Sequence, residues 1–63
     1  MIERQEVPVK GLSVGDWVEV NMGEAYQILD IETNAHGRVR LGFVKNKYHY
    51  IGEHATIDLL IAA

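Results

Sequence analysis

Three histidines, His36, His49 and His54, are the residues of this chain whose type best suits metal binding. Their spacings do not place two of them on one face of a regular element, and no acidic cluster completes a ligand set. We therefore predict no metal site. His36 is expected in a turn, and His49 in a strand, on the face opposite Tyr48 and Tyr50.

Acid–base and nucleophilic catalysis need polar groups tuned by their neighbours, and the sequence offers no such arrangement. Asp30 and Glu32 are expected to lie beside arginines, which would keep them ionised instead of tuning one as a general acid. Ser13 is expected in a turn without a nearby base, and the chain has no nucleophile elbow or glycine-rich phosphate loop. The sequence predicts a protein that is not an enzyme and needs no cofactor.

Aromatic side chains suggest binding of another protein. Trp17 shares a strand face with Glu19 and is expected to stay partly exposed, whereas Phe43 follows the apolar positions into the core. A domain this small also needs large side chains for its core, so both uses of the aromatic residues stay open. The predicted partner-binding residues are Trp17, Tyr48, Tyr50 and Leu60.

The charge of the chain is uneven, with −5 over residues 1–32 and +2 over residues 33–63, for −3 overall. Basic residues interleaved with tyrosines can bind RNA through phosphate contacts and base stacking. An acidic chain is repelled by a polyanion, and a salt-bridged outer sheet face would use the same residues. The alternative function is therefore that of a dimeric, RNA-binding post-transcriptional regulator, with candidate residues Arg4, Arg38, Arg40, Lys45 and Lys47.

Residues 28–44 predict a β-hairpin, because one register matches every side chain. It places Glu32 opposite Arg38 and Asp30 opposite Arg40, so that one face carries pairs of opposite charge. The same register sets aliphatic pairs on the other face, namely Ile31 with Val39 and Leu29 with Leu41. Such patterning is how antiparallel strands fix their register.

Other strands are expected at 17–20, at about 26–32 and at 48–51, separated by glycine and asparagine turns. The apolar parity changes between Ile28 and Leu29, which predicts a bulge or a strand bent between two sheets. Residues 55–63 fit either a strand or a helical stripe, and we favour the strand. Five short strands predict an all-β fold, a small SH3-like barrel.

Sixty-three residues predict one domain, 1–63, which buries only about 60% of the surface of its unfolded chain. Leu60 cannot face inward together with Leu59 and Ile61, so it either closes a barrel or packs on another subunit, and we favour a homodimer. The chain has no cysteine, no signal-peptide pattern and no apolar run that could span a membrane. A soluble, cytoplasmic protein is expected.

Two fragments resemble the carbon storage regulator family of small bacterial RNA-binding proteins. They are residues 12–16 followed by Val18 and Val20, and residues 39–43. The resemblance implies a strand-exchanged β dimer. This chain has Gln5–Glu6 and residues 52–54 near the places where that family carries its RNA-binding basic residues. The first fragment is also typical of SH3-like barrels.

Overall fold

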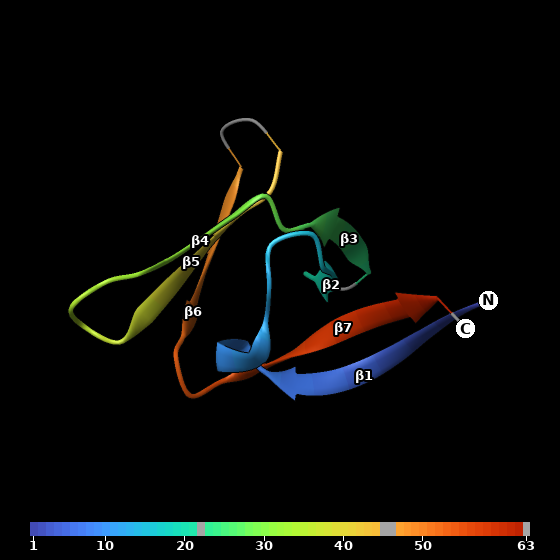
Figure 1. Cartoon of the computed structure of the whole chain (residues 1–63), viewed down its shortest axis with the longest axis horizontal. Coiled ribbons are helices and arrows are strands. Elements are labelled where there is room, and N and C mark those ends of the chain that lie inside the picture. Colours follow the sequence, from blue (N-terminus) through green and yellow to red (C-terminus); the bar gives the residue numbers. More distant parts are fainter. Residues whose placement is uncertain (22, 45–46, 63) are drawn as a thin grey trace.

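The computed structural model describes residues 1–21, 23–44 and 47–62, and these form seven strands in two antiparallel sheets. Sheet A contains, in spatial order, β1 (Ile2–Pro8), β7 (Thr56–Ala62), β2 (Trp17–Val20) and β3 (Glu24–Gln27). Sheet B contains β4 (Asp30–Thr33), β5 (Arg38–Gly42) and β6 (Tyr48–Gly52) (Figure 1). A 3-10 turn, η1 (Val9–Gly11), follows β1. The predicted all-β class is confirmed.

The chain passes from sheet A to sheet B at Ile28 and Leu29. The Ile28 amide donates to the Asp16 carbonyl at 2.8 Å, and the Leu29 amide donates to the Gly42 carbonyl at 2.8 Å. Ile28 is fully buried, whereas Leu29 is 56% exposed. The predicted bend is confirmed, and the two halves of the expected strand are β3 and β4. In the described part of the chain, the two sheets do not close into a barrel.

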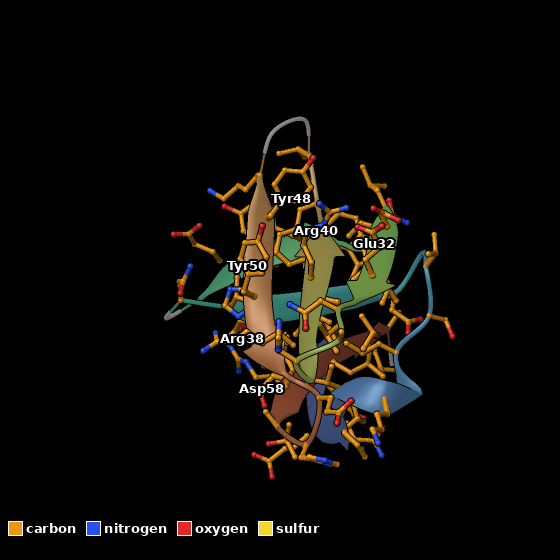
Figure 2. The ribbon with its side chains drawn as sticks, turned by 90° about the vertical axis from the view of Figure 1, so that its left-hand side faces the viewer. Glu32, Arg38, Arg40, Tyr48, Tyr50 and Asp58 are labelled. Carbon is orange, nitrogen blue, oxygen red and sulfur yellow. The ribbon has the colours of Figure 1, made fainter. Side chains whose placement is uncertain are left out.

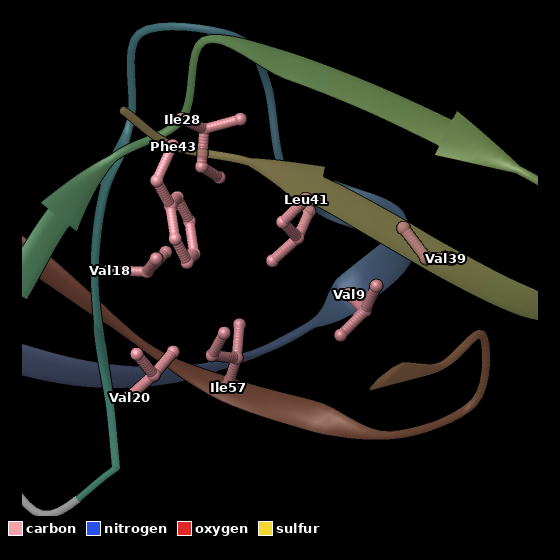
Figure 3. Close-up of a cluster of buried hydrophobic side chains, with 8 residues drawn as sticks. All are labelled: Val9, Val18, Val20, Ile28, Val39, Leu41, Phe43 and Ile57. Carbon is pink, nitrogen blue, oxygen red and sulfur yellow. The ribbon is translucent and has the colours of Figure 1, made fainter. Parts of the chain in front are cut away.

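The core lies between the inward faces of the two sheets (Figure 3). Along β2 and β5, buried residues alternate with more exposed ones, because successive side chains of a strand point to opposite faces. Phe43 is buried, as predicted, and its ring stacks on that of Tyr26 at 4.9 Å between centroids. The buried apolar residues are Val9, Val18, Val20, Ile28, Val39, Leu41, Phe43 and Ile57.

The predicted hairpin forms, but its register differs by two residues from the predicted one. Glu32 lies opposite Arg40, and Asp30 lies opposite Gly42. An offset of two residues keeps the paired side chains of β4 and β5 on their predicted faces. The faces of the paired residues were therefore predicted correctly, and the positions directly opposite each other were wrong. The predicted ion pair of Asp30 with Arg40 still forms, diagonally across the strands at 3.5 Å. Leu29, which was predicted on the aliphatic face opposite Leu41, is instead exposed. Leu29 lies before the ladder, and Arg38 lies opposite Gly52 of β6.

The turn between β4 and β5 explains this register. The Asn34 amide donates to the Arg38 carbonyl at 2.9 Å, which leaves a three-residue loop from Ala35 to Gly37. Gly37 has a φ of 75°, the left-handed conformation that such loops require. The Asn34 side-chain oxygen also accepts bonds from the amides of His36 and Arg38, at 2.8 and 3.1 Å. These local bonds favour the observed register over the predicted one, in which two pairs of opposite charge would lie directly across from each other.

Strand β1 was not predicted from the sequence. It is mostly polar and exposed on both faces, so its sequence shows no alternating apolar pattern. Among the described strands, its partner is β7. Pro8 ends β1 at the edge of the sheet, where a missing amide donor is tolerated. Figure 1 shows the far ends of β1 and β7 projecting away from sheet B, with both termini there. The strand favoured for residues 55–63 is confirmed for residues 56–62, which form β7; residue 63 lies outside the described residues.

We predict that Gly37→Ala lowers the free energy of unfolding by about 1–2 kcal/mol, because a side chain in the left-handed region is strained. Its new Cβ would also lie 3.3 Å from Oε1 of Glu53. Urea denaturation followed by circular dichroism measures the change. The control is Gly11→Ala, whose Cβ would meet nothing within 4 Å and which has no positive φ. Equal losses in the two variants would contradict the role assigned to the turn.

Candidate functional site

The predicted partner-binding residues lie in two sets on different sheets. Trp17 of β2 and Leu60 of β7 are opposite each other on the outward face of sheet A. Tyr48 and Tyr50 lie on the outward face of β6, at the edge of sheet B. The four residues therefore form two pairs on different sheets, and each pair marks a separate candidate binding surface.

Trp17 and Leu60 line an apolar groove of about 380 Å³ across sheet A. Every strand of the sheet contributes to this apolar groove, which consists of Ile2, Trp17, Ala25, Leu60 and Ala62. Trp17 is 49% exposed and Ile2 is 68% exposed. The predicted partial exposure of Trp17 is confirmed. Sequence reasoning missed Ile2 because it missed the pairing of β1 with β7.

The loop before β2 fixes the place of Trp17. Gly15 has a φ of 99°, and the Asp16 amide donates to the Ser13 carbonyl at 3.1 Å. The Asp16 carboxylate in turn accepts a bond from the Ser13 amide at 2.9 Å. Because Val18 and Val20 face the core, Trp17 must face outward. Trp17 is thus the first residue of β2, a strand that is paired with β3 on one side and with β7 on the other.

A row of carboxylates borders the apolar groove. Asp58 of β7 lies opposite Glu6 of β1 on one side and opposite Glu19 of β2 on the other. Arg4 donates from Nε to Glu19 Oε2 at 2.8 Å. We call Glu6, Asp58 and Glu19 the acidic row; with Arg4 it carries a net charge of −2. Like charges directly opposite each other lower the stability of a sheet.

On sheet B, Arg40 lies at the centre of the outward face, between Glu32 and the two tyrosines (Figure 2). Its guanidinium bonds with Glu32 and lies 3.5 Å from Oδ2 of Asp30 and 4.9 Å from the Tyr48 ring centroid. Burial acts to lower the pKa of Arg40, but Glu32, Tyr48 and Asp30 raise the pKa above its ordinary value. Arg40 and Tyr48 are thus engaged with each other.

Arg38 lines a polar cleft of about 250 Å³ beside Arg40. The other lining residues are Glu32, Thr33, Asn34, Arg40 and Tyr50. The predicted pair of Arg38 with Glu32 was wrong, since Glu32 binds Arg40 instead. Arg38 is exposed and makes no ion pair with another described residue.

The remaining RNA-binding candidates are dispersed. Arg4 binds Glu19 on sheet A, and Lys47 lies 3.6 Å from Oε2 of Glu24. Lys45 lies outside the described residues. Arg38 and Arg40 are thus brought together at one cleft, while Arg4 and Lys47 are engaged elsewhere.

None of the three histidines belongs to a group of three ligand side chains among the described residues. His36 is exposed in the turn, and His54 is exposed with its Nε2 at 3.3 Å from Oε1 of Glu53. His49 lies on the face of β6 opposite Tyr48 and Tyr50, as predicted. Its ring stacks on that of Phe43 at 6.4 Å between centroids. Within residues 1–21, 23–44 and 47–62, no three His, Cys, Asp or Glu side chains are grouped for metal binding. The same residues contain no helix both long and apolar enough to cross a membrane.

Comparison of the chain with protein-family models, curated proteins and solved structures gives no match. The resemblance to the carbon storage regulator family stays a prediction. The two outward faces therefore remain as candidate sites, and the groove on sheet A is lined by apolar residues whereas the cleft on sheet B is lined mostly by polar ones.

A small polar cluster joins β3 to the residue before β6. The Tyr26 hydroxyl donates to Glu24, and the Lys47 ammonium lies 4.8 Å from the Tyr26 ring centroid. The hydrogen bond from Tyr26, and then the charge of Lys47, lower the pKa of Glu24. Tyr26, followed by Glu24, raises the pKa of Lys47. This cluster stabilises the fold when Glu24 is ionised.

We predict that Glu24→Gln lowers the Tm at neutral pH and that its difference from the unmodified protein shrinks in acid. The folded-state pKa of Glu24 is below its ordinary value, so its contribution is present above the unfolded pKa and is lost as pH falls through the folded pKa. Thermal unfolding at several values between about pH 7 and pH 3 measures this. A difference that widens toward low pH would contradict the assignment.

Proposed function

We propose that this chain is a non-enzymatic binding module that acts through protein–protein contacts, with the apolar groove of sheet A as its contact surface. The observation that carries the proposal is Trp17, half exposed within a continuous apolar strip. Tryptophan is among the residues that contribute most to binding energy at protein interfaces. The flanking Ala25 and Ala62 leave room for a partner's side chain beside the indole.

The rigidity of this surface supports the proposal. Trp17, Leu60 and Ala62 belong to strands that are hydrogen-bonded to neighbours within sheet A. A partner would therefore meet a preformed surface, and little conformational entropy would be lost on binding. On sheet B, by contrast, Arg40 already covers part of the Tyr48 ring.

An SH3-like arrangement is the finer fold that we propose. Adjacent strands run in the order β7, β2, β3 in sheet A, and the bend at Ile28 continues β3 into β4, β5 and β6 of sheet B. Taken with β3 and β4 as one bent strand, this path has five strands, and β1 is an addition at its edge. Small barrels of this kind bind peptides through aromatic residues on their surface.

RNA binding has less support. Three of its four described basic residues, Arg4, Arg40 and Lys47, are held in ion pairs with carboxylates. The chain also carries a net charge of −3, which opposes the approach of a polyanion. Arg38 beside Tyr50 is what remains of the basic surface.

The test is affinity capture from the native host with three immobilised baits: the unmodified chain, Trp17→Ala and the control Tyr50→Ala. We expect Trp17→Ala to keep its circular dichroism spectrum and to lose its specific partner by about tenfold or more, as removal of a central interface residue does. Quantitative mass spectrometry measures the loss. Tyr50→Ala, which removes a similarly exposed aromatic ring from sheet B, should retain the partner.

Unfolding of Trp17→Ala would show that the indole is a core residue and would overturn the proposed surface. Loss of the partner in Tyr50→Ala alone would move the contact to sheet B. Capture of RNA that decreases steeply with salt and depends on Arg38 would favour the alternative function.

A further inference from the structure

We infer that the partner segment seated in the apolar groove carries a lysine or arginine beside its apolar anchor, because the acidic row borders this groove. The inference rests on the proposed function and names the chemistry of the partner. Without a partner, the sheet holds three carboxylates side by side on one outward face. A cation supplied by the partner would relieve that repulsion, while an acidic partner would increase it.

The charges within the face support this reading. Arg4 bonds with Glu19, but Glu6 and Asp58 make no ion pair with any other described residue. Asp58 is partly buried at the centre of the row, between Glu6 and Glu19. An opposite charge placed there is screened less than one placed in open solvent. The row therefore favours a cation at Asp58 and Glu6.

The strand geometry gives the spacing of the recognised side chains. Asp58 and Leu60 are two residues apart on β7 and share the outward face, which corresponds to about 7 Å. A partner segment in extended conformation along β7, with its apolar side chain over Leu60 and Trp17, would place the side chain two residues away near Asp58. We therefore expect the partner segment to carry an apolar residue and a basic residue separated by one residue of any type. The basic residue can precede or follow the apolar one, depending on the direction in which the segment runs along β7.

A second copy of this chain fits the face less well. In a symmetric dimer the same patch is used by both subunits, so a second acidic row would join the first in the interface. The same charge argues against a nucleic acid on this face. The homodimer predicted from Leu60 is therefore one of the outcomes that would contradict the inference.

The probes are two sets of fluorescein-labelled heptapeptides, each with a leucine or phenylalanine anchor. One set has lysine or arginine two residues from the anchor, and the matched set has glutamate there. Fluorescence anisotropy should show the basic set binding at least about fivefold more tightly at low salt, with the preference decreasing as the ionic strength rises. Trp17→Ala should abolish binding of the basic set.

Asp58→Asn and Glu6→Gln should each reduce the preference for basic peptides while leaving Tm unchanged or higher, because each removes one of the carboxylates that repel each other. Glu3→Gln is the matched control, since Glu3 belongs to the same strand but lies opposite Ile61, on the other face of sheet A. It removes the same charge and should leave the preference intact. Equal effects of Glu3→Gln and Glu6→Gln would show only a change in overall charge and would overturn the inference.

Three other outcomes would overturn the inference without removing the proposed function. Equal binding of both peptide sets, lost in Trp17→Ala, would leave an apolar groove without charge preference. Failure of both sets while affinity capture still depends on Trp17 would show a partner of different chemistry. Sedimentation showing a dimer that Trp17→Ala dissociates would make a second copy the occupant. Capture that does not depend on Trp17 would instead overturn the proposed function itself.

Discussion

The burial of Ile28 at the bend between the sheets is the constraint on which the rest of the structure depends. Its amide and carbonyl bond with the backbone of Asp16 and Gly15, so the side chain is held in the core while Leu29 turns outward. This reversal lets one continuous segment belong to both sheets and folds sheet B over sheet A. The alternation along β2 and β5 then decides which side chains face outward.

The outward faces of the two sheets differ in how completely their charged side chains form ion pairs within the chain. On sheet B, Arg40 bonds with Glu32 and Asp30 and lies over Tyr48, so the charges there compensate within the chain. On sheet A, the exposed Trp17 shares its face with the acidic row, whose three carboxylates face the single positive charge of Arg4. The outward face of sheet A thus has exposed apolar area and an excess of negative charge. A partner that covered the first and balanced the second would gain binding free energy from both.

The hairpin of β4 and β5 shows how much could be predicted. Alternation of charged and aliphatic residues correctly assigned the faces of the residues paired in β4 and β5, because side-chain direction has a period of two. Leu29, just before β4, is the exception, since it is exposed. The register was wrong by two residues, since ion pairs at the surface are worth little and the loop from Ala35 to Gly37 decided the pairing. The register therefore follows from the turn, and the charges fix only the face on which each side chain lies.

From the sequence alone, the all-β class, the bend at Ile28 and the partial exposure of Trp17 could be determined, because each depends on residues close together in the chain. The tertiary structure alone decided that β1 pairs with β7. That pairing places Ile2 in the apolar groove with Ala62, and Glu6 beside Asp58. The two residues of each pair are separated by most of the chain. No local pattern specifies such a pair, since an edge strand exposed on both faces needs no alternation of its own.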